Sequence, residues 1–307
     1  MLRKGTFILM KTKIQDMTSG SPGRLIILFA IPLMLGNICQ QLYTMVDTMV
    51  VGQVAGVEAL AALGAVDFLM WVVTGISTGL TQGFSIQLSQ YYGAKDFENL
   101  RKSLAHSYRL TAFIAVGVLI LSQSFAALVL TGLHTPSNII GMSLLYLRII
   151  FCGIPATAAY NMFASALRAM GNSKTPLTAM IIASVLNVSL DLLFVAGFGW
   201  GVAGAAIATV IAQSFSAVYC FLILRRIDIV HLTKADFMSA SGMNARLMKL
   251  GIPVVFQNII IGVGGLVVQY VINGYGSFLW QDLQLQISFM VCWKWQLFPM
   301  DMPSLLM

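Results

Sequence analysis

Long apolar stretches alternate with short polar segments along most of this chain. About 20 consecutive apolar residues form a helix long enough to cross the ~30 Å hydrocarbon core of a bilayer. Seven stretches reach that length, and they lie at about 25–50, 60–88, 104–130, 149–167, 177–196, 203–224 and 250–272. The pattern predicts an all-α membrane protein, folded as a polytopic helical bundle.

The composition supports a membrane location. Of the 307 residues, 58% are hydrophobic and only 9% are charged, and the mean hydropathy is +0.84. Soluble domains carry about 25% charged residues, because water solvates them and lipid does not. The net charge of +7 lies in segments between apolar stretches rather than on one face, so we expect a lipid bilayer as partner and no nucleic acid.

Basic residues also predict the orientation. The loops near 51–59, 131–140 and 197–202 contain no Lys or Arg, whereas the alternate connections and the N-terminal tail are basic. An excess of Lys and Arg marks the cytoplasmic side of a membrane protein. We therefore expect a multi-pass protein of the cytoplasmic membrane with its N-terminus in the cytoplasm.

Cysteine and histidine give no sign of a metal site. The four cysteines form no CxxC pair, and His106, His134 and His231 are far apart in the sequence. We expect free thiols, no disulfide framework, no structural metal and no organic cofactor.

An internal similarity suggests a repeat. Pro32 is followed five residues later by Asn37, and Pro253 by Asn258, in similar apolar surroundings. Duplicated bundles are typical of secondary transporters. The predicted organisation is a cytoplasmic tail (1–23), a six-helix N-terminal lobe (24–224), a cytoplasmic linker (225–249), the first helix of a second lobe (250–276) and an aberrant tail (277–307).

Two arginines enclose the fourth predicted span. Nineteen residues lie between Arg148 and Arg168 and cover ~29 Å as a helix. We expect both side chains to extend to opposite membrane interfaces.

Three acidic residues fall within predicted spans: Asp47, Asp67 and Asp191. An aspartate at the centre of a membrane helix costs ~2.5–3.5 kcal/mol on insertion scales, so such residues are functional candidates. Asp47 lies ~22 residues into the first span and Asp191 ~14 residues into the fifth, which places both in the outer half of the membrane. Asp67 follows Glu58 closely, and we expect it at the outer end of its helix.

Two further polar residues complete a predicted cluster. Asn187 precedes Asp191 by four residues and shares its helix face, and Thr209 lies at a similar level if the fifth and sixth helices are antiparallel neighbours. A carboxyl group removed from water beside a second carboxylate binds a proton more tightly, and the same oxygens can bind Na⁺. The cluster predicts an H⁺ or Na⁺ site.

Three stretches resemble the MATE (multidrug and toxic compound extrusion) transporters, and they read GRLIILFAIPLMLGNICQQLYTMVDTMVVGQVAGVEALAALG (23–64), YLRIIFCGIPATAAYNMFASALRAMGNSKTPL (146–177) and NVSLDLLFVAGFGWGVAGAAIAT (187–209). That family has twelve helices in two six-helix lobes. The resemblance implies a cation-coupled antiporter that exports drugs or other amphipathic organic solutes. It places the cation site of the first lobe at Asp47, Asn187, Asp191 and Thr209, and a helix bend at Pro32.

The resemblance stops after the seventh helix. A back-translation of 280–307, read two nucleotides further on, resembles the eighth-helix region of the family, which predicts a frameshift and a truncated protein. Without its lobe, the seventh helix would expose small and polar faces to lipid. We therefore expect the chain as given to be unstable or inactive, and we see no obligate protein partner.

Three other functions remain as alternatives. A lipid-linked oligosaccharide flippase shares the two-lobe architecture but needs cationic residues in its cavity, for which only Arg109 and Arg148 are candidates. An intramembrane enzyme is disfavoured, because HExxH, GxSxG and paired catalytic aspartate motifs are absent from the sequence. A seven-helix receptor would have the same span count but an external N-terminus.

Overall fold

The computed structural model describes residues 22–238 and 242–273. Every regular element in these two ranges is helical, which confirms the all-α prediction. The helices are α1 (Pro22–Val54), α2 (Val57–Gly64), α3 (Asp67–Gly93), α4 (Phe97–Gly132), α5 (Ile140–Cys152), α6 (Ile154–Ala169), α7 (Lys174–Asp191), the π-helix η1 (Leu192–Gly197), α8 (Gly201–Leu224), the 3₁₀ turns η2 (Asp228–Val230) and η3 (Lys234–Phe237), and α9 (Met243–Asn273). Residues 1–21 and 274–307 lie outside the described residues. They include most of the predicted N-terminal tail (1–23) and all of the predicted aberrant tail (277–307), where the frameshift is proposed.

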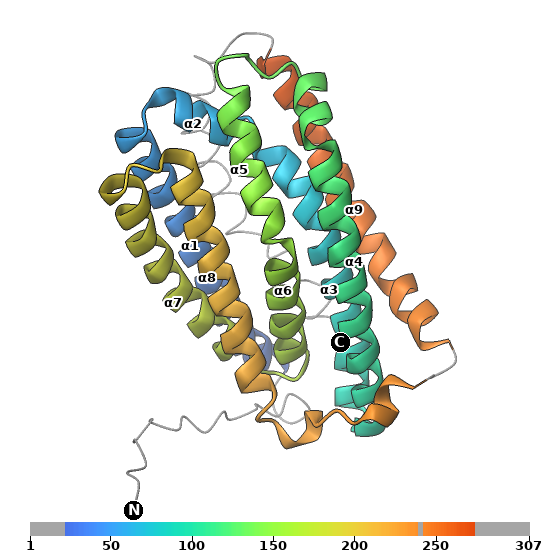
Figure 1. Ribbon diagram of the computed structural model, residues 1–307. Coiled ribbons are helices and arrows are strands. Elements are labelled where there is room, and N and C mark those ends of the chain that lie inside the picture. Colours follow the sequence, from blue (N-terminus) through green and yellow to red (C-terminus); the bar gives the residue numbers. More distant parts are fainter. Residues whose placement is uncertain (1–21, 239–241, 274–307) are drawn as a thin grey trace, which may run out of the picture.

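The long helices lie side by side in one bundle (Figure 1). The short helix α2 lies at one end of the bundle, and the connection between α8 and α9 crosses the opposite end (Figure 1). α7 packs against α8 and α1, while α9 packs mainly against α3. This order brings the three helices that carry the predicted site into mutual contact.

Several helices have the length and composition of membrane spans. In the described ranges four qualify as single helices: α4, α7 with η1, α8 and α9. Two pairs qualify as bent spans, α2 with α3 at an angle of 41° and α5 with α6 at 48°, which brings the number to six. α1 contains 33 residues and covers the first predicted stretch.

The fourth predicted span, 149–167, is wrong at its start. α5 begins at Ile140, and the chain bends at Gly153 before Pro155 in the first turn of α6. Arg148 therefore lies inside α5 rather than at its end, with an exposed side chain. An arginine on the outer surface of a helix can extend its charge along the helix to the interface, so it need not mark a helix end.

The seventh helix also begins earlier than predicted. α9 starts at Met243, so the linker is 225–242 instead of 225–249. Arg246 and Lys249 lie on exposed positions of the first turns of α9. The apolar stretch marks only the part of a helix that crosses lipid, and this helix continues beyond it into the linker region.

Glycines bring α3 and α9 into backbone contact. A Cβ atom added to Gly83 would lie 2.3 Å from the Cα atom of Gly251, and one added to Gly79 would lie 2.8 Å from the backbone nitrogen of Val255. Gly75 continues the same face of α3, one turn further along, and faces Asn258. Small residues at this spacing allow helix backbones to approach closely in membranes.

Polar side chains of α9 are paired along this contact. The Asn258 amide donates to the carbonyl oxygen of Gly75 over 3.1 Å, and the Gln269 amide donates to the carbonyl oxygen of Ala65. The expectation that α9 exposes its small and polar faces is therefore wrong for these residues. These side chains pack against the first six-helix unit.

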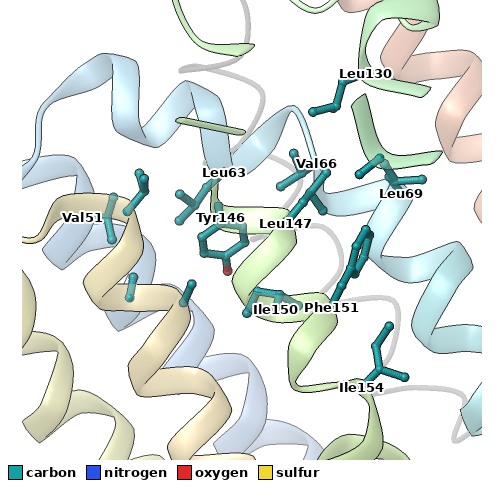
Figure 2. Packing of buried hydrophobic residues seen from close by; sticks show 14 of the residues in the cluster. Val51, Leu63, Val66, Leu69, Leu130, Tyr146, Leu147, Ile150, Phe151 and Ile154 are labelled. Carbon is teal, nitrogen blue, oxygen red and sulfur yellow. The ribbon is translucent and has the colours of Figure 1, made fainter. Parts of the chain in front are cut away.

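The bundle has two main apolar clusters. The cluster in Figure 2 joins residues of α1 to α6 and α8 near the end where α2 lies. It includes Leu63, Val66, Leu147, Phe151 and Ile154 (Figure 2). The second cluster joins α3, α4, α6, α8 and the linker near the opposite end. The two apolar clusters pack the helices against one another, and this packing positions the polar residues that the helices carry.

The linker is attached to α4 by polar contacts. The backbone N–H and the hydroxyl of Thr233 both donate to Asp236, at 2.7 and 2.8 Å. The Arg101 guanidinium lies 3.9 Å from the same carboxylate. Burial alone would raise the pKa of Asp236, but the Thr233 hydrogen bonds and the Arg101 charge outweigh it and hold that pKa below its ordinary value.

Candidate functional site

The two predicted carboxylates, Asp47 and Asp191, lie in the same buried region. Asp47 on α1 is 6% exposed and Asp191 at the end of α7 is 0% exposed. Asp47 is seven residues from the end of α1, and Asp191 is six residues from the end of η1, which corresponds to ~10 Å of helix in each case. The charge of Asp47 acts on Asp191, so the two groups form one electrostatic site.

Asn187 and Thr209 join this site as the sequence predicts. Asn187 lies one turn before Asp191 on α7 and is 1% exposed. Its side-chain amide donates to the hydroxyl of Thr209 on α8 over 3.4 Å. α7 and α8 are antiparallel neighbours, which was the condition for placing Thr209 at this level.

The site consists of acceptor atoms that lack donors. Both carboxylate oxygens of Asp191, the Oδ1 atom of Asp47 and the Oδ1 atom of Asn187 are buried and have no hydrogen-bond partner in the structure. Each buried polar atom left in this state costs about 1–3 kcal/mol. A proton or a small hard cation is the ligand that satisfies several oxygen acceptors at once. The geometry therefore fits a cation better than an anion or an apolar ligand.

The backbone changes conformation directly after Asp191. The α-helical hydrogen-bond pattern of α7 gives way to a six-residue π-helix, Leu192–Gly197. π-helical turns inside longer helices occur frequently at functional sites. Asp191 is therefore the last residue of the regular α-helix, directly before this turn.

Two tyrosines at this site were missed by the sequence analysis. Tyr43 on α1 and Tyr146 on α5 both lie within the electrostatic reach of Asp47 and Asp191. Tyr146 lies among the labelled apolar side chains in Figure 2, close to Leu63 and Leu147. Tyr43 precedes Asp47 by four residues and therefore shares its helix face, so the sequence could have placed Tyr43 at the site. Tyr146 had no such signal, because α5 was predicted to begin after it.

The remaining predicted residues lie apart from this cluster. Asp67 is exposed at the first position of α3, as expected for the end of a helix, although its charge still acts on Asp47. Pro32 lies inside α1, which is assigned as one continuous helix from Pro22 to Val54. The bend at Pro32 stays a prediction.

A small cavity adjoins the carboxylates. Its volume is about 30 Å³. It is lined by α1, α6, α7 and α8 with Gln40, Tyr43, Tyr160, Met180, Ala183, Ser184, Asn187, Thr209, Ala212, Gln213 and Ser216. Neither Arg109 nor Arg148 is among them: Arg109 contacts His106 on its own helix, and Arg148 is exposed on α5. The cavity thus lacks the cationic lining that the flippase alternative requires.

Buried, unpaired carboxylates inside a multi-pass helical bundle are typical of membrane transport proteins. The model of the MatE family matches residues 32–193, which is more than half of the chain. The chain therefore belongs to the MatE family of MATE transporters. Because this is a family of transporters, the receptor and enzyme alternatives are set aside.

Known relatives agree with this assignment. The chain is 31% identical over 265 residues to the probable multidrug resistance protein YpnP of Bacillus subtilis, covering 86% of this chain and 59% of YpnP. It is 30% identical to the probable multidrug resistance protein YoeA of the same organism, covering 86% of this chain and 58% of YoeA. A structure of a MOP superfamily transporter from Pyrococcus furiosus is 26% identical, with a TM-score of 0.76, over 81% of this chain and 55% of that one. The chain thus spans somewhat more than half the length of the relatives that it matches.

Proposed function

We propose that this chain forms the first lobe and the first helix of the second lobe of a cation-coupled exporter of amphipathic organic solutes. Entry of H⁺ or Na⁺ would drive export across the cytoplasmic membrane, with the N-terminus in the cytoplasm. The observation that carries this proposal is the set of buried, unpartnered acceptor oxygens on Asp47, Asn187 and Asp191. Two relatives described as probable multidrug resistance proteins support the class of substrate.

The coupling follows from the electrostatics of the site. Two buried carboxylates without a cation repel each other and lack hydrogen-bond donors, so the conformation that buries them is disfavoured. Binding of a cation removes this penalty and favours the buried arrangement. A cation can shift a conformational equilibrium only by its difference in affinity for the two states, and burial of the carboxylates supplies that difference.

The site also connects three helices that can move together. Asp47 lies on α1, Asp191 on α7 and Thr209 on α8. A bound cation would hold these helices against one another, and its release would free α1 to rearrange, for which Pro32 is the natural bending position. The organic substrate would then meet a cavity whose shape depends on the cation.

Drug resistance in a sensitive host tests this function. We expect the chain, completed with a second lobe, to raise resistance to cationic dyes, and Asp47→Asn and Asp191→Asn to abolish that gain at equal expression. Asp228→Asn is the matched control, because its carboxyl group is fully exposed in the linker. Unchanged resistance in both site variants would reject the coupling site.

A further inference from the structure

Gln213 on α8 is a half-buried polar residue that the predicted cation cluster does not use. It lies one helical turn after Thr209 on the same face, ~6 Å further along the helix. Its Oε1 atom is buried without a hydrogen-bond partner, as is the Oδ1 atom of Asn187. Both residues line the 30 Å³ cavity, so two orphan acceptors meet in one small space.

The position of the Gln213 side chain is held by Tyr43. The hydroxyl group of Tyr43 is hydrogen-bonded to Gln213, and Tyr43 also lies within the electrostatic reach of Asp47 and Asp191. This contact occupies one end of the amide and leaves the Oε1 atom as the unpaired end. Gln213 is thereby linked to the carboxylate site although it is not part of it.

The cavity extends from the level of Tyr43 and Asn187 toward the end of the bundle where the linker lies. Thr209, Gln213 and Ser216 follow one another along one face of α8 in that direction. α1 and α7 contribute Gln40 and Ser184, each about one turn nearer that end than Tyr43 and Asn187. Several polar side chains therefore follow one another along a cavity whose lining is otherwise mainly apolar.

The size and chemistry of the cavity define its ligand. A water molecule needs at least about 10–15 Å³ of such space, so 30 Å³ holds about two species of that size. Two unpaired acceptors that line one cavity are satisfied either by a species with two donors or by a cation. Two aspartates within one turn of the cavity add a negative field that favours the cation over neutral water.

We propose that this cavity is a second binding station for a hydrated monovalent cation, with the Oε1 atom of Gln213 and the Oδ1 atom of Asn187 as its protein ligands. A cation moving between the carboxylates and the linker end of the bundle would rest there with one water molecule. The proposal rests on the function proposed above, because it extends the path of the coupling cation.

Equilibrium binding of radioactive Na⁺ to the purified chain in lipid nanodiscs tests the station. Choline chloride keeps the ionic strength constant, and an alkaline buffer keeps the carboxylates free of protons. We expect a tight component from the carboxylates and a weaker one from the cavity. Gln213→Met, which is similar in volume but lacks the amide, should weaken the second component by about tenfold or more and keep the first.

Two further variants make the result decisive. Gln213→Glu keeps an acceptor oxygen at the same place, so the weaker component should persist or tighten. Gln90→Met, at an exposed position near the end of α3, should match the unchanged chain. Circular dichroism and gel filtration confirm that each variant is folded.

The outcomes separate this inference from the proposed function. The second station would be overturned if folded Gln213→Met bound Na⁺ with the same isotherm as the unchanged chain. It would also be overturned if that variant lost both components, or if the unchanged chain bound no Na⁺ at all. By contrast, a tight component that survives in Asp191→Asn contradicts the coupling site while leaving the station in place.

Discussion

The side-chain amide of Asn187 on α7 donates to the hydroxyl of Thr209 on α8 over 3.4 Å, one helical turn from Asp191. This hydrogen bond joins two antiparallel helices at the level of the acidic site. It also fixes the direction of the Asn187 amide, so that its Oδ1 atom stays unpaired and available for a cation. The contact is therefore part of the site as well as part of the helix packing.

Removal of the Thr209 hydroxyl should weaken cation binding without unfolding the bundle. Thr209→Val keeps the shape of the side chain but removes the acceptor for Asn187, and loss of one such hydrogen bond costs about 0.5–1.5 kcal/mol. We expect a several-fold weaker affinity for Na⁺ or H⁺, measured as a shift of the binding isotherm. Thr178→Val is the control, because its hydroxyl is exposed and bonds only to its own helix at Lys174. Equal affinities in the two variants would show that the Thr209 hydroxyl plays no part.

The contact between α3 and α9 predicts opposite effects of one substitution at two glycines. A methyl group at Gly83 would collide with the backbone of Gly251, whereas Gly117 on α4 has nothing within 4 Å of a new Cβ atom. Gly83→Ala should lower thermal stability in detergent by about 1–3 kcal/mol through overpacking. Gly117→Ala should be neutral or stabilising by up to about 1 kcal/mol, because alanine favours the helix. If both variants are equally stable, the close approach of α3 and α9 is absent in solution.

Asp236 predicts how the linker responds to pH. The pKa of Asp236 lies below its ordinary value in the folded chain. Its carboxylate therefore stabilises the fold fully above the pKa of the unfolded chain, about 3.9. This stabilisation is lost as the pH falls through the lower pKa of the folded chain. Asp236→Asn should therefore cost about 1 kcal/mol near neutral pH, the size of a lost cap. That difference should shrink to nothing in strongly acidic buffer.

The control for this prediction is Asp228→Asn. Asp228 is fully exposed and contacts only His231 at 3.8 Å. Thermal unfolding of both variants across the pH range measures the effect. A stability loss in Asp236→Asn that persists below pH ~3 would assign the effect to packing rather than to the charge.

The residues of the acidic site were predictable because they break a strong pattern. A carboxylate or an amide is rare inside an apolar helix, so Asp47, Asn187 and Asp191 stand out against their neighbours. Helical spacing then placed Asn187 and Asp191 on one face, and the antiparallel order of two consecutive helices placed Thr209 beside them. These arguments need only the helix period and the direction of each span.

Other features were not predictable from the same pattern. Hydropathy measures which residues tolerate lipid but not where a helix bends or ends, so the early starts of α5 and α9 were missed. Tyr146 lies before the predicted fourth span (149–167), and only the packing of α5 brings it to the site. The match between Gly83 and Gly251 involves residues far apart in the chain, and glycine spacing alone does not identify the partner helix.

The most direct measurement of the central claim is cation-driven substrate movement in proteoliposomes. The protein completed with a second lobe would be reconstituted with a fluorescent cationic dye, and an inward gradient of H⁺ or Na⁺ would be imposed. We predict dye movement driven by at least one of these gradients, and its loss in Asp191→Asn with dye binding retained. Gradient-driven movement in Asp191→Asn at the rate of the unchanged protein would contradict the claim that this buried carboxylate couples the cation to export.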